Sequence, residues 1–330
     1  MKTDTDAPLL RVNDLGKNFP LGGGFFSGKK GVVRAVHGVS FDLNRGETLG
    51  IVGESGCGKT TLARTLLRLE EPTDGRVEFD GIDLFARSSL RSKALRRRIQ
   101  VVFQDPYAAL NPRMTVSEIL KEPLRNHPDI LPRENWSARI KELLEQVGLR
   151  PEYAARFPHE FSGGQLQRIG IARALVLQPE LVILDEPVSA LDVSVQAQVI
   201  NLLMELQRNL GVSYIIIAHD LSVVRHISNR VAVMYLGKIV EIGDADDIYV
   251  RPAHPYTDAL LSAEPQIALD RPRKAGVLLK GETPSPINPP SGCPFRTRCW
   301  KAQEQCKQVP PVISPYRSEH KVSCHFPLCQ

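Results

Sequence analysis

Residues 53–60 read GESGCGKT, which is the spacing of a phosphate-binding loop. An apolar run at 49–52 precedes the loop and a helical pattern at 61–69 follows it, so the loop joins a strand to a helix. The glycines let backbone N–H groups face phosphate oxygens, and the helix N-terminus favours an anion. We expect Lys59 to reach the β- and γ-phosphates of ATP and Thr60 to coordinate Mg²⁺. The loop residues expected to contact the nucleotide are Gly53, Ser55, Gly56, Cys57, Gly58, Lys59, Thr60 and Thr61.

Two acidic residues follow a second apolar run. Residues 181–184 predict a buried strand, and Asp185 and Glu186 come directly after it. Ligands bind at the carboxyl ends of strands in α/β sheets, so both carboxylates are placed for chemistry. Asp185 suits the Mg²⁺ shell, and Glu186 suits a general base that polarises an attacking water. The alternative, two solvated acids at a strand end, is disfavoured by the phosphate loop upstream.

Five of the six cysteines lie between residues 293 and 329. The N-terminus, MKTDTDAPLL, lacks a secretory signal, so we expect a reducing cytosol in which structural disulfides are rare. Clustered thiolates in a segment with few core residues indicate a metal site. Four cysteines can hold Zn²⁺ or a [4Fe–4S] cluster, and their spacings match neither a zinc ribbon nor a ferredoxin run. Free thiols are the third possibility.

The elements that position these residues are strands alternating with helices. Short apolar runs at 48–52, 99–103, 181–184 and 214–218 predict buried strands, and helical patterns lie between them. This alternation predicts an α/β fold with a mostly parallel sheet. From residue 271 onward the chain contains ten of its 25 prolines, which predicts a loop-rich appendage beginning near residue 270.

The composition of the 330 residues is that of a globular protein, with 42% hydrophobic residues and a net charge of +5. It argues against collagen, a long coiled coil and wholesale disorder, and no apolar run approaches the length of a membrane span. Residues 270–330 contain ten Lys and Arg against four Asp and Glu. We interpret this basic tail as a solvated surface and expect no nucleic-acid partner.

Residues 161–168, FSGGQLQR, together with the phosphate loop resemble the signature motif of ABC-transporter ATPases. The resemblance extends along the chain in order. Gln104 resembles the Q-loop glutamine, Asp192 the D-loop aspartate, His219 the switch histidine and Phe19 the aromatic residue that stacks on adenine. It implies an ABC-type ATPase domain over residues 1–269, with a mostly parallel core sheet, an antiparallel β part and a helical subdomain at about 105–178. Residues 270–330 would form the small Cys/Pro-rich C-terminal domain.

The resemblance also implies a mechanism in which two ATPase subunits face each other head to tail. ATP would lie between the phosphate loop of one subunit and the signature helix start of the other. Gln104 would join the Mg²⁺ or water shell, His219 would hold the γ-phosphate, and Asp192 would cross the interface. The signature residues implied to contact the nucleotide are Ser162, Gly163, Gly164 and Gln165.

Residues 254–261, HPYTDALL, and the tail resemble ATP-binding subunits of dipeptide and oligopeptide importers, most of all the dipeptide branch. Implied partners are a second, different ATP-binding subunit, two transmembrane permeases and an extracytoplasmic peptide-binding protein. The chain would lie peripherally on the cytoplasmic face of the inner membrane. The resemblance favours a [4Fe–4S] cluster over Zn²⁺, with Cys329 as the spare cysteine. Its implied ligands are Cys293, Cys299, Cys306 and Cys324.

Two alternative functions remain at this point. One is the same ATPase role in an importer of nickel or another small solute, because the nickel-importing branch is a close relative. The other is a soluble ABC-type ATPase acting on DNA or the ribosome. It is disfavoured because Lys59 and Ser162 are too close in sequence for a long coiled-coil insertion, and because the chain carries one ATPase unit.

Overall fold

The computed structural model describes residues 7–21, 31–86, 89–263, 279 and 281–328, and it divides the chain into two compact units. Unit 1 consists of Met1–Leu43, Leu49–Phe85 and Ala218–Gln330, and unit 2 of Asn44–Thr48 and Ala86–Ile217. Among the described residues, no helix is long and apolar enough to cross a membrane.

Unit 1 contains an antiparallel sheet in the order β2-β1-β4-β5. Its strands are β1 (Leu10–Pro20), β2 (Val32–Leu43), β4 (Asp74–Phe79) and β5 (Ile82–Asp83). Leu10 and Val12 of β1 are buried and pair with Leu43 and Phe41 of β2, which are buried as well. Alternate residues of a strand share one face, so this register lines one face of the sheet with apolar side chains.

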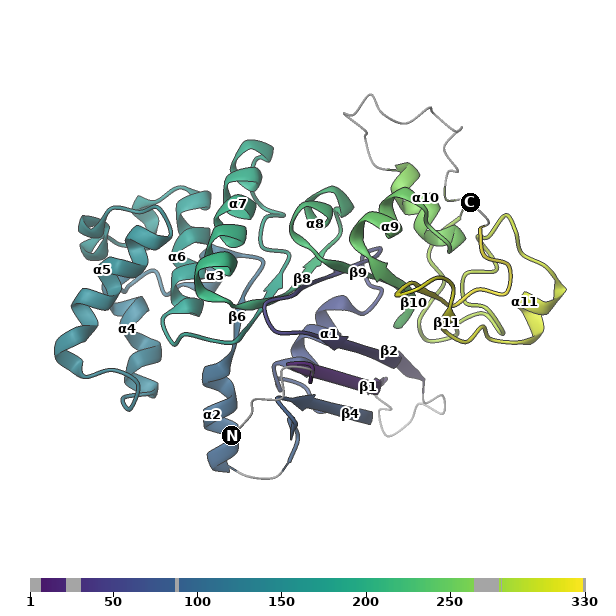
Figure 1. Ribbon diagram of the computed structural model, residues 1–330, viewed down its shortest axis with the longest axis horizontal. Helices are drawn as coiled ribbons and strands as arrows, with labels where there is room; N and C mark the ends of the chain where they lie inside the picture. The colour runs from purple at the N-terminus through teal and green to yellow at the C-terminus, as the bar shows by residue number, and fades with distance from the viewer. Residues whose placement is uncertain (1–6, 22–30, 87–88, 264–278, 280, 329–330) are drawn as a thin grey trace. The chain divides into compact units, whose positions relative to one another are not determined.

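A second set of strands in unit 1 carries the phosphate loop. β3 (Thr48–Val52) pairs in parallel with β9 (Arg230–Tyr235), and β10 (Lys238–Asp244) lies antiparallel to β9. The end of the chain extends this sheet, because β12 (Lys321–Val322) pairs with β10 and β11 (Ser314–Pro315) pairs with β12. The helices of unit 1 are α1 (Lys59–Leu66), α8 (Leu221–Ile227), α9 (Ala245–Val250), α10 (Pro255–Ala263) and α11 (Glu304–Gln308) (Figure 1).

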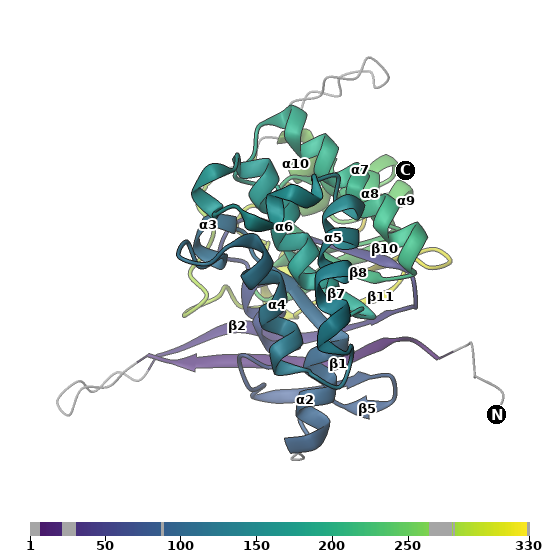
Figure 2. The ribbon, with the colours of Figure 1, turned by 90° about the vertical axis from the view of Figure 1, so that its left-hand side faces the viewer.

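Unit 2 is built on three parallel strands, β6 (Ile99–Val102), β7 (Leu181–Asp185) and β8 (Ser213–Ala218). Between β6 and β7 the chain is helical, and α4, α5 and α6 pack against one another (Figure 2). The helices are α2 (Ser89–Arg98), α3 (Pro106–Ala109), α4 (Val116–Asn126), α5 (Trp136–Gln146), α6 (Gly163–Leu175) and α7 (Val193–Leu210). Three short 3₁₀ turns are η1 (Arg133–Asn135), η2 (Pro151–Ala155) and η3 (Pro158–Glu160).

Glu180 forms hydrogen bonds that connect the starts of the three strands of unit 2. Its carboxylate accepts hydrogen bonds from Arg98, which precedes β6, and from Arg45. Its backbone N–H donates to Arg98 O at 2.9 Å, and its carbonyl accepts from Ser213 N at 2.9 Å. One side chain and its peptide groups therefore align the N-terminal edge of this sheet.

The α/β fold with parallel and antiparallel strands and a helical part is confirmed. The apolar runs that predicted strands are β3, β6, β7 and β8. Strands β3, β7 and β8 are largely buried, whereas β6 is buried only at Ile99 and Val102, and Phe103 is exposed beyond its end. The predicted domain limits at 1–269, 105–178 and 270–330 remain predictions, and residues 264–278, around the limit at 269/270, lie outside the described part of the chain. The described tail residues belong to unit 1, where β12 pairs with β10.

Candidate nucleotide-binding site

The phosphate loop of unit 1 connects β3 to α1 and depends on glycine at two positions. Gly53 and Gly58 have φ angles of 152° and 108°. A Cβ on Gly53 would lie 2.2 Å from Met234 O, and one on Gly58 would lie 2.1 Å from Ala35 O. Side chains would therefore both strain the backbone and collide with neighbouring strands, so these glycines are needed for the loop to close on the sheet.

Lys59 folds back over the loop that precedes it. Its Nζ donates to Gly53 O at 2.6 Å and to Glu54 O at 3.1 Å, and the residue is 5% exposed. The neighbouring Cys57 is buried, and burial raises the pKa of its thiol, which is therefore neutral at pH 7. The outer face of the loop is open, because Ser55, Gly56 and Thr60 are exposed.

Two further predicted residues belong to unit 1. His219 is exposed directly after the buried strand β8, and Asp220 caps the following helix α8 by accepting from Ser222 N and Val223 N. Phe19 lies near the end of β1, where Lys17 Nζ lies 4.9 Å from its ring centroid. His219 follows the strand that the sequence predicted at 214–218, and the contact of both residues with a nucleotide stays a prediction.

Unit 2 supplies the carboxylates. Asp185 ends β7, and Glu186 follows in a left-handed conformation with φ 47°, which is uncommon for a residue other than glycine. Glu186 N donates to Ile217 O at 2.9 Å, which fixes the turn. Gln104 Nε2 donates to Glu186 Oε2 at 2.9 Å and to Ser189 Oγ at 3.4 Å. The structure thus brings together Gln104 and Glu186, two of the residues expected to act on ATP.

Ser189 is a site residue that sequence reasoning did not single out. Its hydroxyl accepts from Gln104 and donates to Glu186 O at 3.1 Å, so it joins the Q-loop glutamine to the backbone of the acidic turn. A signal was present, because Ser189 lies three positions before Asp192, the residue that resembles the D-loop aspartate. Only the tertiary contact shows that its hydroxyl meets Gln104 and the Glu186 carbonyl.

The signature residues start helix α6. Ser162 Oγ accepts from Gln165 N at 3.4 Å, and Gln165 Oε1 accepts from Ser162 N at 3.1 Å, which is a reciprocal capping box. Because the Ser162 hydroxyl is the acceptor in this capping box, its O–H can still donate to an acceptor outside the helix. The helix N-terminus adds a positive dipole end. Gly164 packs against helix α7. That helix begins at Val193, directly after the exposed Asp192. This end of α6 can bind an anion.

The candidate residues therefore form two sets, one in each unit. Unit 1 contains Phe19, the phosphate loop with Lys59, and His219, which suit phosphate and base binding. Unit 2 contains the acidic turn with its glutamine and the signature helix start, which suit metal binding, water activation and a second phosphate contact. Thr60 and Asp185 offer hydroxyl and carboxylate oxygens, the donors that Mg²⁺ prefers.

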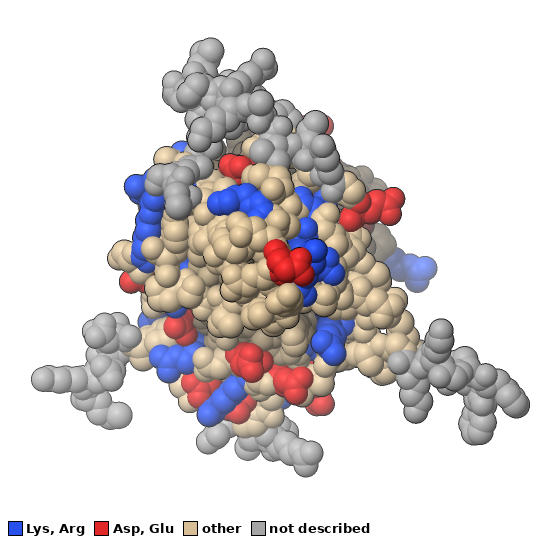
Figure 3. Space-filling view, turned by 90° about the vertical axis from the view of Figure 1, so that its right-hand side faces the viewer, with Lys and Arg blue, Asp and Glu red and all other residues tan. Residues whose placement is uncertain are grey.

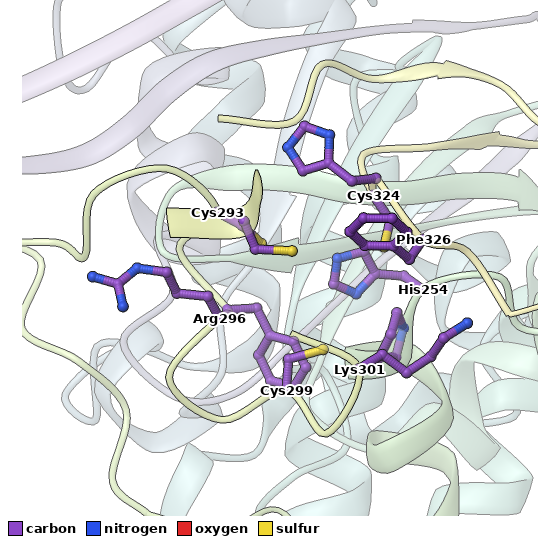
Figure 4. A pocket seen from close by; sticks show the side chains of 11 residues that line it. His254, Cys293, Arg296, Cys299, Lys301, Cys324 and Phe326 are labelled. Atoms are coloured by element: carbon purple, nitrogen blue, oxygen red, sulfur yellow. The ribbon is translucent and has the colours of Figure 1, made fainter. Parts of the chain in front are cut away.

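The cysteines of the tail come together around one pocket of unit 1 (Figure 4). Cys293, Cys299, Cys306 and Cys324 all line it, and none of these thiols forms a disulfide. Burial raises the pKa of Cys293, Cys299 and Cys324, in the last case to about 11. Across the described ranges, no group of three or more His, Cys, Asp or Glu side chains is arranged as a metal site. Cys329 lies outside the described residues.

The surface charge of the tail side is mixed. On the face shown in Figure 3, Lys and Arg side chains are interspersed with Asp and Glu side chains among uncharged groups. The expectation of a solvated surface agrees with this face, and the absence of a nucleic-acid partner stays a prediction.

Comparisons with known proteins extend over nearly the whole chain. Residues 36–189 match the family described as ABC transporter, and residues 240–306 match "Oligopeptide/dipeptide transporter, C-terminal region". The chain is 54% identical to the oligopeptide transport ATP-binding protein AppF of Bacillus subtilis, covering 96% of this chain and 97% of the relative. It is 51% identical to the dipeptide transport ATP-binding protein DppF of Escherichia coli, covering 94% and 92%.

Solved structures agree with this similarity. The dimeric ATP-binding cassette MJ0796, in a post-hydrolysis state with ADP and Pi, is 28% identical with a TM-score of 0.63, covering 72% of this chain and 98% of the cassette. The cbiO1 protein of Clostridium perfringens, part of the ABC transporter complex cbiONQ, is 28% identical with the same TM-score, covering 74% and 91%.

Proposed function

This chain belongs to the ATP-binding subunits of peptide-transporting ABC importers, and from that premise we propose that it hydrolyses MgATP to drive peptide import. The observation that carries the proposal is the pairing of Gln104 with Glu186 at the end of a buried strand, in a chain that also has a closed phosphate loop with Lys59. These parts contribute to phosphoryl transfer, which depends on positioning and charge stabilisation.

In the proposed reaction, Lys59 exchanges its bonds to the loop carbonyls for bonds to the β- and γ-phosphates of ATP. Thr60 and Asp185 are the residues that would hold Mg²⁺, and the ion would supply positive charge against the phosphate oxygens. Glu186, oriented by Gln104, accepts a proton from the attacking water. His219 holds the γ-phosphate, and Phe19 stacks on the adenine.

The second half of each nucleotide site comes from another subunit in this proposal. The start of α6, with Ser162 as its cap, supplies N–H groups and a hydroxyl for the γ-phosphate bound in the partner. The dimeric state of the relative MJ0796 supports such an arrangement. We propose a different ATP-binding chain as the partner, two permease subunits, a peptide-binding protein, and a peripheral position on the cytoplasmic face of the cell membrane.

The cysteine pocket is proposed as the site of a [4Fe–4S] cluster, with Zn²⁺ as the alternative. The support is that four cysteines of the tail line one pocket in a segment with few core residues. The residues that would hold the cluster are Cys293, Cys299, Cys306 and Cys324, and its role would be to stabilise the tail. Anaerobic purification followed by iron, sulfide and zinc analysis tests this proposal. Iron with acid-labile sulfide supports it, and stoichiometric zinc without iron overturns it.

The substrate class is proposed from relatives that are named for oligopeptide and for dipeptide transport. The test is uptake of labelled di- and tripeptides by cells lacking this gene and complemented with the wild-type gene or with Lys59→Ala. We expect the wild-type gene alone to restore peptide uptake. Nickel and a haem precursor serve as parallel probes, and loss of one of these with unchanged peptide uptake would keep the ATPase role but change the substrate.

A further inference from the structure

Glu54, the acidic residue of the phosphate loop, is held by the tail of the chain. Arg298 donates two parallel hydrogen bonds to its carboxylate, Nη1 to Oε2 at 2.6 Å and Nη2 to Oε1 at 2.9 Å. The Thr283 hydroxyl donates a third, to Oε2 at 3.0 Å. A bidentate pair of this kind has both charge assistance and a fixed geometry.

The backbone of Glu54 is fixed as well. Its N–H donates to the hydroxyl of Tyr256, on α10, at 2.9 Å, and its carbonyl accepts from Lys59 Nζ at 3.1 Å. Each polar group of this residue thus has a partner, and the partners include the catalytic lysine. The position of Glu54 consequently sets the local geometry of the loop around Lys59.

Arg298 is anchored in the tail by its neighbours. Phe295 is 1% exposed and packs its ring against Tyr235 and Tyr256, with ring centroids 5.3 and 5.4 Å away. The side chain of Arg298 is only 5% exposed, whereas that of Glu54 is 22% exposed. Because the Arg298 side chain is buried beside this packed cluster, the tail holds the Glu54 carboxylate in place.

The charge of Glu54 is the reason why its contact with Arg298 affects nucleotide binding. Burial alone would raise the pKa of Glu54, but hydrogen bonds from Arg298 and Thr283 outweigh it and lower the pKa, so the carboxylate is ionised at pH 7. It also attracts Lys59 electrostatically. An ionised carboxylate free in a phosphate loop would both pair with that lysine and repel the phosphates.

We propose that Arg298 is a positioning residue for ATP binding: it holds and neutralises Glu54, so that Lys59 is available to the phosphates. This inference rests on the ATP-binding role proposed above for the phosphate loop. It assigns to the peptide-importer tail a direct part in the nucleotide site of its own subunit, carried by a residue that lies 244 positions from its partner.

The test compares MgATP binding by full-length variants, measured by displacement of a fluorescent ATP analogue. Arg298→Gln is expected to weaken binding ~10-fold, because Glu54 then competes with phosphate for Lys59. Arg298→Lys keeps the positive charge but loses the two parallel hydrogen bonds. Its affinity is expected to lie between those of wild type and Arg298→Gln. Lys307→Gln, which removes an exposed tail charge paired with Glu304, is the matched control and is expected to bind within about twofold of wild type.

The decisive variant is the double substitution Glu54→Gln with Arg298→Gln. Removing the carboxylate removes the competitor, so this variant is expected to regain affinity to within about threefold of wild type. A merely structural role for the ion pair would leave the double variant as weak as Arg298→Gln. In the assembled importer, Arg298→Gln is expected to raise the KM for ATP about as much as the Kd, with kcat changed less than about twofold.

The outcomes distinguish a failure of this inference from a failure of the ATP-binding role on which it rests. Normal binding by Lys59→Ala would remove the phosphate loop as the ATP site, and the inference with it. Loss of binding in Lys59→Ala together with unchanged binding in Arg298→Gln would overturn the inference alone. Thermal unfolding identifies variants that fail to fold, and if Arg298→Gln is one of them, Arg298→Lys and the double variant decide the question by the same criteria.

Discussion

At the scale of single residues, Glu186 combines an unusual backbone with a specific partner. Its left-handed φ of 47° and its N–H bond to Ile217 O turn the carboxylate toward Gln104. Strained backbone of this kind persists where the surroundings determine it, and it is common at functional sites. The carboxylate is thereby oriented before ATP binds.

We predict that Glu186→Gln keeps MgATP affinity within about threefold of wild type but lowers hydrolysis in the assembled importer at least ~100-fold, because the amide cannot accept the proton of the attacking water. Steady-state phosphate release and nucleotide binding measure the two effects. Glu205→Gln, an equal charge change at an exposed position of α7, is the control. Normal turnover by Glu186→Gln would show that another group acts as the base.

Gln104 is predicted to act through Glu186. Gln104→Ala removes the 2.9 Å bond to the carboxylate and is expected to lower kcat about tenfold while the KM for ATP changes less than about threefold, since hydrogen bonds to charged groups are the stronger ones. Gln100→Ala is the matched control, because the Gln100 amide donates to backbone carbonyls of Arg96 and Ile99. Equal effects of the two substitutions would contradict the assigned role.

At the scale of elements, helices α6 and α7 approach closely at Gly164. A Cβ at this position would lie 2.4 Å from Cγ1 of Val195, a β-branched side chain with little freedom to move. Gly164→Ala is therefore expected to lower the free energy of unfolding by about 1–3 kcal/mol through overpacking.

Denaturant titration measures this change, and two further variants test its cause. Gly164→Ala combined with Val195→Ala is expected to recover most of the loss. Gly170→Ala, on the same helix, meets nothing within 4 Å among the described residues and is expected to be neutral or stabilising by up to ~1 kcal/mol. If Gly170→Ala destabilised as much as Gly164→Ala, crowding against α7 would not be the reason.

The strand starts of unit 2 predict a pH dependence through Glu180. Hydrogen bonds from Arg98 lower the pKa of Glu180, burial opposes them less strongly, and Arg45 lowers it further. A carboxyl whose pKa is lower in the folded state stabilises the fold fully above about pH 4.5, and this stabilisation is lost as the pH falls through the folded pKa.

Glu180→Gln is accordingly expected to be less stable at pH 7, by on the order of 1 kcal/mol because the side chain is 36% exposed and screened by solvent. Its free energy of unfolding is also expected to fall less steeply than that of wild type below about pH 5. Urea titrations from pH 3 to pH 7 measure how steeply the free energy of unfolding changes with pH in wild type and in Glu180→Gln. Parallel slopes for the two proteins would exclude Glu180 as a source of the acid sensitivity.

At the scale of the whole molecule, local sequence patterns predicted the helices and strands but not the contacts between residues far apart in the chain. The strands β3, β6, β7 and β8 and the helix start at Ser162 were predictable, because apolar runs and capping residues act within a few positions. The Gln104–Glu186 and Arg298–Glu54 contacts were not, because no local pattern encodes which distant side chains meet. The gathering of the tail cysteines around one pocket was expected, whereas the ion that would join them stays a proposal.

The separation of Glu54 from Arg298 has a consequence for biosynthesis. At ~5–20 residues per second, a ribosome adds Arg298 roughly 10–50 s after Glu54, because 244 positions separate them. On the role proposed for Arg298, a nascent chain can form its phosphate loop long before it can bind ATP well. Tight nucleotide binding would then mark a finished polypeptide, and chains that end before Arg298 would compete for ATP only weakly.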